Sequence, residues 1–77
     1  MQTKLNLQDT FLTRARRSKS NVVVFLMNGY QMRGTIGGFD SFVVILLTDG
    51  KQQIIYKHAI STIVPERPLD LEGPEEA

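Results

Sequence analysis

A lysine and a histidine stand side by side in the segment YKHAIST, residues 56–62, between two apolar runs. Because the flanking residues favour β structure, Lys57 and His58 are expected where one strand ends and the next begins. Short connectors held by rigid strands are common locations for binding groups. A solvent-exposed turn without a function explains the same pair, so the surrounding sequence has to decide between the two interpretations.

The chain offers little of the chemistry that an enzyme needs. Its 77 residues contain one histidine and no cysteine, and the central part of the chain adds only Asp40 and Asp49 as carboxylates. These residues supply neither a nucleophile with a neighbouring base nor a cluster of metal ligands. We therefore expect a binding protein that is not an enzyme, that takes no metal or other cofactor, and that has no small-molecule substrate.

An amphipathic helix is predicted at about residues 7–18. Apolar side chains recur there at helical spacing, and Asn6 can cap the first turn. A helix of only three turns is marginal in water by itself, so its apolar side must pack on the strands that follow. That side consists of Leu7, Phe11, Leu12 and Ala15.

Four cations lie in the second half of this helix and directly after it: Arg14, Arg16, Arg17 and Lys19. The helix dipole favours cations at this end, so a solvated face explains them. Four cations within six residues of one small domain also fit a patch that contacts phosphate groups.

Five short antiparallel strands are predicted after the helix, within about residues 21–64. Apolar and β-branched side chains cluster or alternate in residues 22–27, 30–36, 42–47, 51–57 and 60–64. The dipeptides Asn28-Gly29 and Asp49-Gly50 predict hairpins, because these residue types tolerate positive φ. Each pair of strands around such a dipeptide is therefore expected to be antiparallel.

Glycines between these signals predict how the sheet is shaped. Gly34 falls in the middle of the second strand and indicates a sharp bend, as in a small barrel. Gly37, Gly38 and Asp40 predict the next turn. The expected fold is mainly β, with an N-terminal helix followed by a bent five-stranded sheet.

The small size of the chain favours self-association. A domain of about 60 residues buries little apolar surface, and without cysteine no disulfide can stabilise it. Residues 22–27 are apolar on both faces, which leaves Phe25 for either the core or a partner.

Tyr30 follows the first hairpin turn, where an exposed ring beside Gln31 and Arg33 fits stacking on unpaired bases.

Charge is distributed unevenly along the chain, although the net charge is only +1. Residues 1–20 carry five Lys or Arg and one Asp, whereas residues 65–77 carry one Arg and five Asp or Glu. This asymmetry suggests an anionic partner for the basic end. Residues 66–77 have too little apolar content to fold, so a disordered acidic tail is expected there. No segment resembles a signal peptide or a membrane span, which favours a cytoplasmic protein without a membrane partner.

Four segments carry a resemblance to a known family. They are LQDTFL (7–12), FLMNGYQMRG (25–34), GFDSF (38–42) and YKHAIST (56–62). Together they resemble the bacterial Hfq family of Sm-like RNA chaperones, in its Firmicute form. The resemblance covers nearly the whole chain, from Leu7 to Pro65.

The resemblance implies an Sm-like, that is SH3-like, domain at residues 1–65: an N-terminal helix and a strongly bent five-stranded antiparallel barrel. It also implies a homohexameric ring in which the fourth strand of one subunit pairs with the fifth strand of the next. The implied function is RNA binding by an RNA chaperone that promotes pairing between small RNAs and mRNAs, and so takes part in post-transcriptional regulation and stress responses. The implied partner is single-stranded RNA.

The resemblance also assigns RNA contacts to two faces and a rim. On the helix side, the proximal residues, which match a site for U-rich RNA, are Gln8, Ser41, Phe42, Lys57 and His58. On the opposite face, the distal residues, which match a site for A-rich and other purine-rich RNA, are Phe25, Tyr30, Gln31, Arg33, Gln53 and Thr62. The rim residues are Arg16, Arg17 and Phe39, with Arg14 and Lys19 as additional cations.

The chemistry of these side chains agrees with the implied ligands. A ring such as Phe42 can stack on a base, and an amide such as Gln53 can pair with adenine. Lys57 and His58 can donate to phosphate, ribose or carbonyl oxygens. The chain departs from the family at position 41, which is Ser where other members have Gln or Lys, and at position 13, which is Thr where many have Asn.

A second interpretation of the same residues is an SH3-like protein-interaction module that does not bind RNA. Such a module would also be a small bent barrel with exposed aromatic side chains. Binding to proline-rich peptides in the absence of RNA binding would distinguish it from an RNA chaperone.

Overall fold

The computed structural model describes residues 7–71 of the 77-residue chain. Its elements are α1 (Leu7–Ser18), β1 (Asn21–Leu26), β2 (Gln31–Phe39), β3 (Val43–Thr48), β4 (Lys51–Tyr56), the short 3₁₀ turn η1 (Lys57–Ala59) and β5 (Ile60–Pro65). The predicted order of one helix followed by five antiparallel strands is confirmed. No helix among the described residues is long and apolar enough to cross a membrane.

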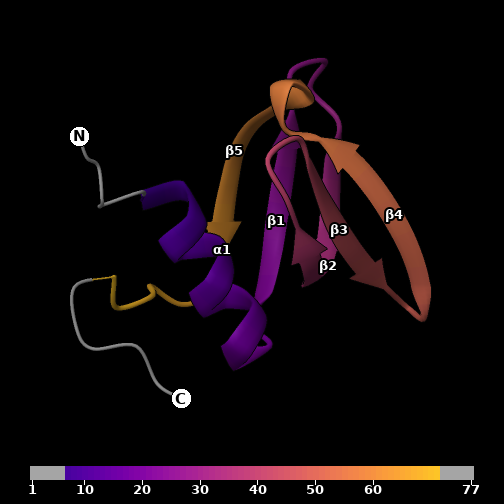
Figure 1. Ribbon diagram of the computed structural model, residues 1–77. Helices are drawn as coiled ribbons and strands as arrows, with labels where there is room; N and C mark the ends of the chain where they lie inside the picture. The colour runs from indigo at the N-terminus through magenta and orange to yellow at the C-terminus, as the bar shows by residue number, and fades with distance from the viewer. Residues whose placement is uncertain (1–6, 72–77) are drawn as a thin grey trace.

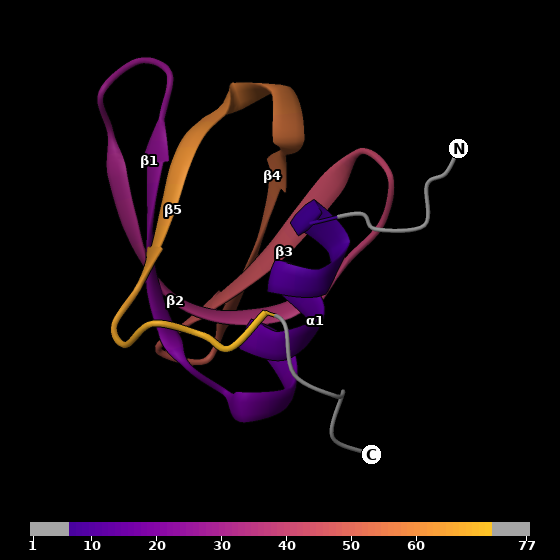
Figure 2. The same cartoon turned by 90° about the vertical axis from the view of Figure 1, so that its left-hand side faces the viewer.

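The five strands form one sheet in the order β4-β3-β2-β1-β5, in which all neighbouring strands are antiparallel. Strand β2 is the longest and belongs to both halves of the sheet: residues 31–35 pair with β1, and residues 35–39 pair with β3. Figures 1 and 2 show β2 curving between these two halves, so that the sheet is strongly bent. Within the described chain, β4 and β5 are the two edges of this sheet.

The core lies between α1 and the inner face of the bent sheet. Helix α1 contributes Leu12 and Ala15, which are three residues apart and therefore lie on one face of the helix. The strands contribute residues at alternate positions, as expected for one buried face. These are Val22, Val24, Ile36, Val44, Leu46 and Ile55.

Helix α1 is matched to its dipole and ends in a defined way. Asp9 lies in the first turn, and Arg16 and Arg17 lie in the last turn. Lys19 takes a positive φ of 54°, and the backbone N–H groups of Lys19 and Ser20 donate to the carbonyls of Arg16 and Ala15. This arrangement satisfies carbonyls that the helix end would leave unpaired.

The two predicted hairpin turns use glycine in different ways. In the first turn, Gly29 takes a φ of 94° while Asn28 does not have positive φ. In the second turn, Asp49 and Gly50 take φ values of 51° and 80°, which is the pattern of a tight two-residue hairpin.

The predicted turn at Gly37 and Gly38 is wrong. Both glycines lie inside β2, which continues to Phe39, and the pairing with β3 shifts register between Ile36 and Gly38. An irregularity of this kind bends a strand without ending it. The turn itself begins at Asp40.

The bend of the sheet depends on close backbone contact at Gly34. A Cβ atom added to this residue would lie 2.2 Å from the carbonyl oxygen of Leu47 and 2.7 Å from the hydroxyl oxygen of Thr48. The neighbouring atom at 2.2 Å belongs to the backbone of β3, so it cannot move aside without shifting the strand. Only a residue without a side chain fits here.

We expect Gly34→Ala to lower the free energy of unfolding by about 1–3 kcal/mol, because the added methyl group forces β2 and β3 apart. Gly38→Ala is the matched control, since a Cβ atom at Gly38 meets nothing within 4 Å. Urea unfolding at one protein concentration measures both variants. Equal stability of Gly34→Ala and the parent protein would show that the strands do not need this close approach.

Candidate nucleic-acid interface

The turn η1 places Lys57 and His58 between the ends of two strands, as the sequence predicts. Three backbone hydrogen bonds hold the turn. The Lys57 N–H donates to the Phe42 carbonyl at 2.8 Å, the Ile60 N–H donates to the Lys57 carbonyl, and the Met27 N–H donates to the Ala59 carbonyl at 2.8 Å. The turn is therefore fixed both to the loop before β3 and to the hairpin after β1.

Asp40 organises the loop that carries Ser41 and Phe42. One carboxylate oxygen, Oδ1, accepts hydrogen bonds from the backbone N–H groups of Phe42 at 2.8 Å and Val43 at 2.9 Å. The Asp40 N–H in turn donates to the Val43 carbonyl at 3.0 Å. Phe42 consequently projects from a fixed loop, with 74% of its surface exposed.

These hydrogen bonds also explain the acidity of Asp40. The Phe42 and Val43 amides, in that order, stabilise the carboxylate and hold the pKa of Asp40 below its ordinary value of 3.8, and the Lys57 charge lowers the pKa further. Asp40 therefore keeps its charge and its two hydrogen bonds over the whole neutral range.

The ammonium group of Lys57 joins three elements. Its Nζ lies 5.7 Å from the centre of the Phe39 ring at the end of β2, and 3.9 Å from Oδ1 of Asp9 in the first turn of α1. The Lys57 side chain is only 15% exposed, so its position is well defined. Phe39, predicted as a rim residue, thus lies under the proximal lysine.

Gln8 shares a groove with Lys57. Both residues line one groove of about 400 Å³ between α1 and β5, together with apolar side chains of both elements. His58 is exposed, and its ring stacks on that of Tyr56 with a centroid distance of 5.8 Å and an angle of 16° between the planes. Gln8 therefore lies at the N-terminus of α1, and Lys57 and His58 lie in η1. Ser41 and Phe42 lie in the loop whose Phe42 carbonyl accepts a hydrogen bond from Lys57.

The distal residues lie mostly on the face of the sheet turned away from the core. Phe25 of β1 pairs with Gln31 on one side and with Thr62 on the other, so these three side chains are cross-strand neighbours. Arg33 lies two residues along the same face from Gln31. Tyr30 precedes β2 and is 69% exposed, and its N–H donates to Oδ1 of Asn28 at 3.0 Å.

Gln53 does not lie on the same face as the other distal residues of its own chain. It pairs with the buried Leu46 and alternates with the buried Ile55, so it lies on the core-facing side of β4. Gln53 is nevertheless exposed, because β4 is an edge strand.

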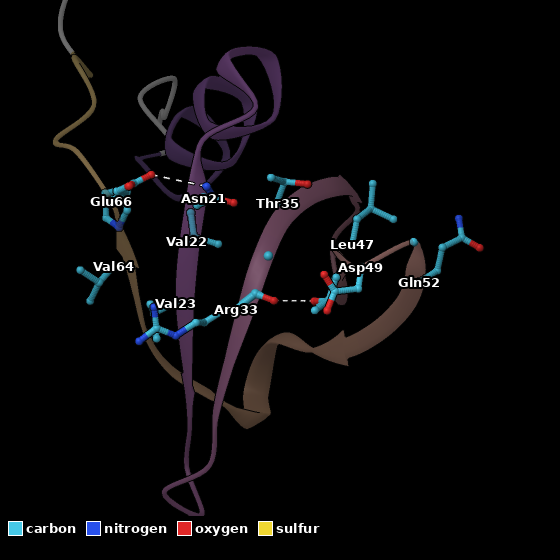
Figure 3. A pocket seen from close by; sticks show the side chains of 14 residues that line it. Asn21, Val22, Val23, Arg33, Thr35, Leu47, Asp49, Gln52, Val64 and Glu66 are labelled. Carbon is cyan, nitrogen blue, oxygen red and sulfur yellow. Dashed lines mark hydrogen bonds between the residues drawn. The ribbon is translucent and has the colours of Figure 1, made fainter.

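A broad groove of about 1220 Å³ continues the outer face beyond Arg33 (Figure 3). Strands β1 and β5 contribute Val23 and Val64, and the β3–β4 hairpin contributes Asp49 and Gln52. Figure 3 shows the Arg33 side chain extending toward Val23. The groove combines the Arg33 cation with two amides, two carboxylates and apolar surface.

The rim cations are not equivalent. Arg16, Arg17 and Lys19 are exposed at the end of α1, whereas Arg14 is half-buried and donates a hydrogen bond to the backbone carbonyl of Asp70. Sequence reasoning did not assign roles to Asp9, Asp40 or Tyr56 at the proximal residues. The sequence does mark Asp40 as a turn residue, but it does not predict that its carboxylate accepts hydrogen bonds from the Phe42 and Val43 amides.

Within residues 7–71, no group of three His, Cys, Asp or Glu side chains lies close enough together to hold a metal ion. The chemistry available at η1 and on the outer face is hydrogen bonding, ring stacking and charge attraction.

Comparison with known proteins identifies the family. The model of the family described as Hfq protein matches residues 7–70. The RNA-binding protein Hfq of Clostridium acetobutylicum is 58% identical over 71 residues, which cover 92% of this chain and 88% of that protein. The RNA-binding protein Hfq of Bacillus pumilus is 54% identical over 68 residues, with coverages of 88% and 93%.

A solved structure agrees with these relatives. The crystal structure of a protein described as the pleiotropic translational regulator Hfq has a TM-score of 0.74 at 47% identity, over 77% of this chain and 98% of that chain. This similarity confirms the Sm-like fold of a helix on a bent five-stranded sheet. The resemblance of the four sequence segments is confirmed as well, and the chain belongs to the Hfq protein family.

Proposed function

We propose that this chain is an RNA chaperone that binds single-stranded RNA on two separate surfaces. U-rich RNA binds at the proximal residues, and A-rich or other purine-rich RNA binds at the distal residues. The relatives named RNA-binding protein Hfq support the choice of RNA as the ligand. By holding a small RNA and an mRNA at once, the protein promotes their pairing in the cytoplasm.

The observation that carries this proposal is the exposed Phe42 on a loop that is hydrogen-bonded to Lys57. The backbone hydrogen bond from Lys57 to Phe42 and the two bonds to Asp40 hold the Phe42 backbone and leave its ring uncovered. An exposed ring and a cation on one fixed frame form a combination that binds unpaired nucleotides, because the ring stacks on the base and the cation attracts phosphate. The amide of Gln8 can both donate to and accept from a uracil edge.

The distal surface combines aromatic rings with hydrogen-bonding groups. Phe25 and Tyr30 offer rings, while Gln31 and Thr62 offer hydrogen-bonding groups on the same outer face. Adenine presents a donor beside an acceptor, which an amide can match. Gln53 joins this site if a neighbouring copy of the chain lies against β4.

We propose a ring of six copies as the active form. Strands β4 and β5 each have one edge without a strand partner among the described residues. Ile54 is 63% exposed, and Tyr56 and Val64 are exposed as well. Pairing β4 of one copy with β5 of the next would satisfy both edges and close a ring by rotation. Six linked sites would raise the affinity for one RNA through effective concentration.

In this ring the exposed cations Arg16, Arg17 and Lys19 would contact the phosphates of two RNAs at the rim.

Solution mass, together with binding of labelled oligo-U and oligo-A, tests the whole proposal. A hexamer that binds both is expected. A monomer that binds neither oligonucleotide, but binds a proline-rich peptide, would establish the protein-interaction module instead.

We expect Lys57→Ala and His58→Ala to weaken oligo-U binding by about 1–3 kcal/mol, the usual cost of a lost base contact, while oligo-A binding stays within about twofold. Lys51→Ala is the matched control, because Lys51 is an exposed lysine at the other end of β4. Fluorescence anisotropy measures both affinities. Equal losses for both oligonucleotides would mean that the substitutions disrupt the assembly and not one site.

Tyr30→Ala should have the opposite selectivity and weaken oligo-A binding by about 1–3 kcal/mol, because it removes an exposed stacking surface. Phe25→Ala should act in the same direction, although Phe25 is half-buried and also contributes to packing. Met27→Ala controls for loss of apolar surface on the same hairpin, since Met27 is 70% exposed. Unchanged oligo-A affinity of the Tyr30 variant would contradict the distal assignment.

Asp40→Asn should weaken oligo-U binding, because a neutral amide holds the Phe42 loop less firmly than a carboxylate does. It should also change the response to acid. Since folding lowers the pKa of Asp40, its contribution to stability is complete above the ordinary pKa of 3.8 and is lost as the pH falls through the lower folded-state value.

Unfolding of the parent protein and Asp40→Asn across this pH range measures the effect. The difference in stability should be constant near neutral pH and shrink below pH 3.8. A difference that stays the same through that range would show that Asp40 is not held by these hydrogen bonds in solution.

A further inference from the structure

The segment that follows β5 runs back along helix α1. Residues 66–71, which we call the strap, leave the sheet at Pro65 and lie beside α1 in both Figure 1 and Figure 2. The strap carries no helix or strand, so side chains and backbone contacts must hold it in place.

Hydrogen bonds anchor the start of the strap near the end of α1. The Glu66 N–H donates to the Asn21 carbonyl at 2.8 Å, and Nδ2 of Asn21 donates to Oε1 of Glu66 at 3.5 Å. Asn21 is the first residue of β1, directly after the helix ending. The strap therefore begins where α1 ends.

The middle of the strap is held by one apolar contact and one cation. Leu69 is half-buried and packs against the core cluster. The guanidinium Nη1 of Arg14, in the middle of α1, donates to the backbone carbonyl of Asp70. Arg14 is half-buried, in contrast to the exposed Arg16 and Arg17.

The strap ends beside the first turn of the helix. Leu71 lines the 400 Å³ groove that is also lined by Leu7, Phe11 and Ile63, and by the proximal residues Gln8 and Lys57. The strap thus runs from the residues after α1, past Arg14 in the middle of the helix, to a groove that the first turn also lines. It covers a side of the helix other than the one that buries Leu12 and Ala15 in the core.

We propose that the strap locks α1 onto the sheet and that Arg14 is its latch, acting as a positioning residue within the protein and not as an RNA contact. A three-turn helix that buries only two residues completely gains much from a second covered side. The lock holds the first turn of α1, and with it Gln8 and Asp9, next to Lys57. Sequence alone groups Arg14 with the other rim cations, but in the structure its guanidinium donates to the backbone of the strap.

Hydrogen exchange of the α1 amides in the full-length chain tests the latch. We expect Arg14→Ala to raise the exchange rates by about fivefold, the effect of losing one hydrogen bond. An increase in the exchange rate is informative, because alanine is a better helix former than arginine. Without a latch, the substitution would therefore slow exchange. Arg16→Ala, at an exposed position of the same helix, is the matched control and should not accelerate exchange.

A second variant identifies what the latch holds. Leu69→Ala removes the apolar anchor of the strap, and it should also accelerate exchange of the α1 amides. Both side chains act through one strap. The exchange rates of the α1 amides in the double variant should therefore exceed those of the faster single variant by less than about twofold. Unchanged exchange in Arg14→Ala, or single effects that multiply in the double variant, would overturn the proposal.

The salt dependence of RNA binding is a second test of the latch, and this test rests on the proposed function. Each phosphate contact adds to the slope of log affinity against log salt concentration. Arg14→Ala should leave this slope unchanged, whereas Arg16→Ala should reduce it. A slope reduced equally by both would make Arg14 an RNA contact and overturn the latch. If the parent protein bound no RNA, the proposed function would fail while hydrogen exchange still decided on the latch.

Discussion

The close approach of β2 and β3 at Gly34 is the contact on which the rest of this structure depends. With the Leu47 carbonyl where a side chain would be, β2 can turn from one half of the sheet to the other without ending. This bend makes room for α1 over the core. It also leads the end of β2, with Phe39 and Asp40, to the place where η1 presents Lys57.

Electrostatics and backbone hydrogen bonds then determine which side chains remain exposed for a ligand. Lys57 is held between a ring and a carboxylate, and Asp40 uses its charge to hold backbone amides. Lys57 is also largely buried, whereas Asp40 is positioned by hydrogen bonds while it remains exposed. The outcome is that the exposed groups, Phe42 and His58, project from a rigid frame. Preorganised groups of this kind bind a flexible ligand with less loss of entropy.

Much of the fold could be predicted from local rules. The helix follows from apolar spacing, and the Asp49-Gly50 hairpin follows from residues that tolerate positive φ. The turn expected at Gly37 and Gly38 failed because a glycine inside a bent strand and a glycine in a turn look the same in sequence. Only the pairing of β2 with β3 distinguishes them.

The candidate site was less accessible to sequence reasoning, because its contacts join distant parts of the chain. The contacts of Lys57 with Asp9 and Phe39, and of Arg14 with Asp70, cross between elements and have no local signal. The position of Gln53 could have been predicted from alternation with the buried Ile55, but its grouping followed the family resemblance.

The central claim is that two RNA surfaces lie on opposite sides of one bent sheet. Native mass spectrometry tests it with the protein mixed with oligo-U and oligo-A that are too short to form a stable duplex with each other. We expect one particle that carries both oligonucleotides, with neither displacing the other at saturation. Mutual displacement, with no particle holding both, would show a single shared surface and contradict the account.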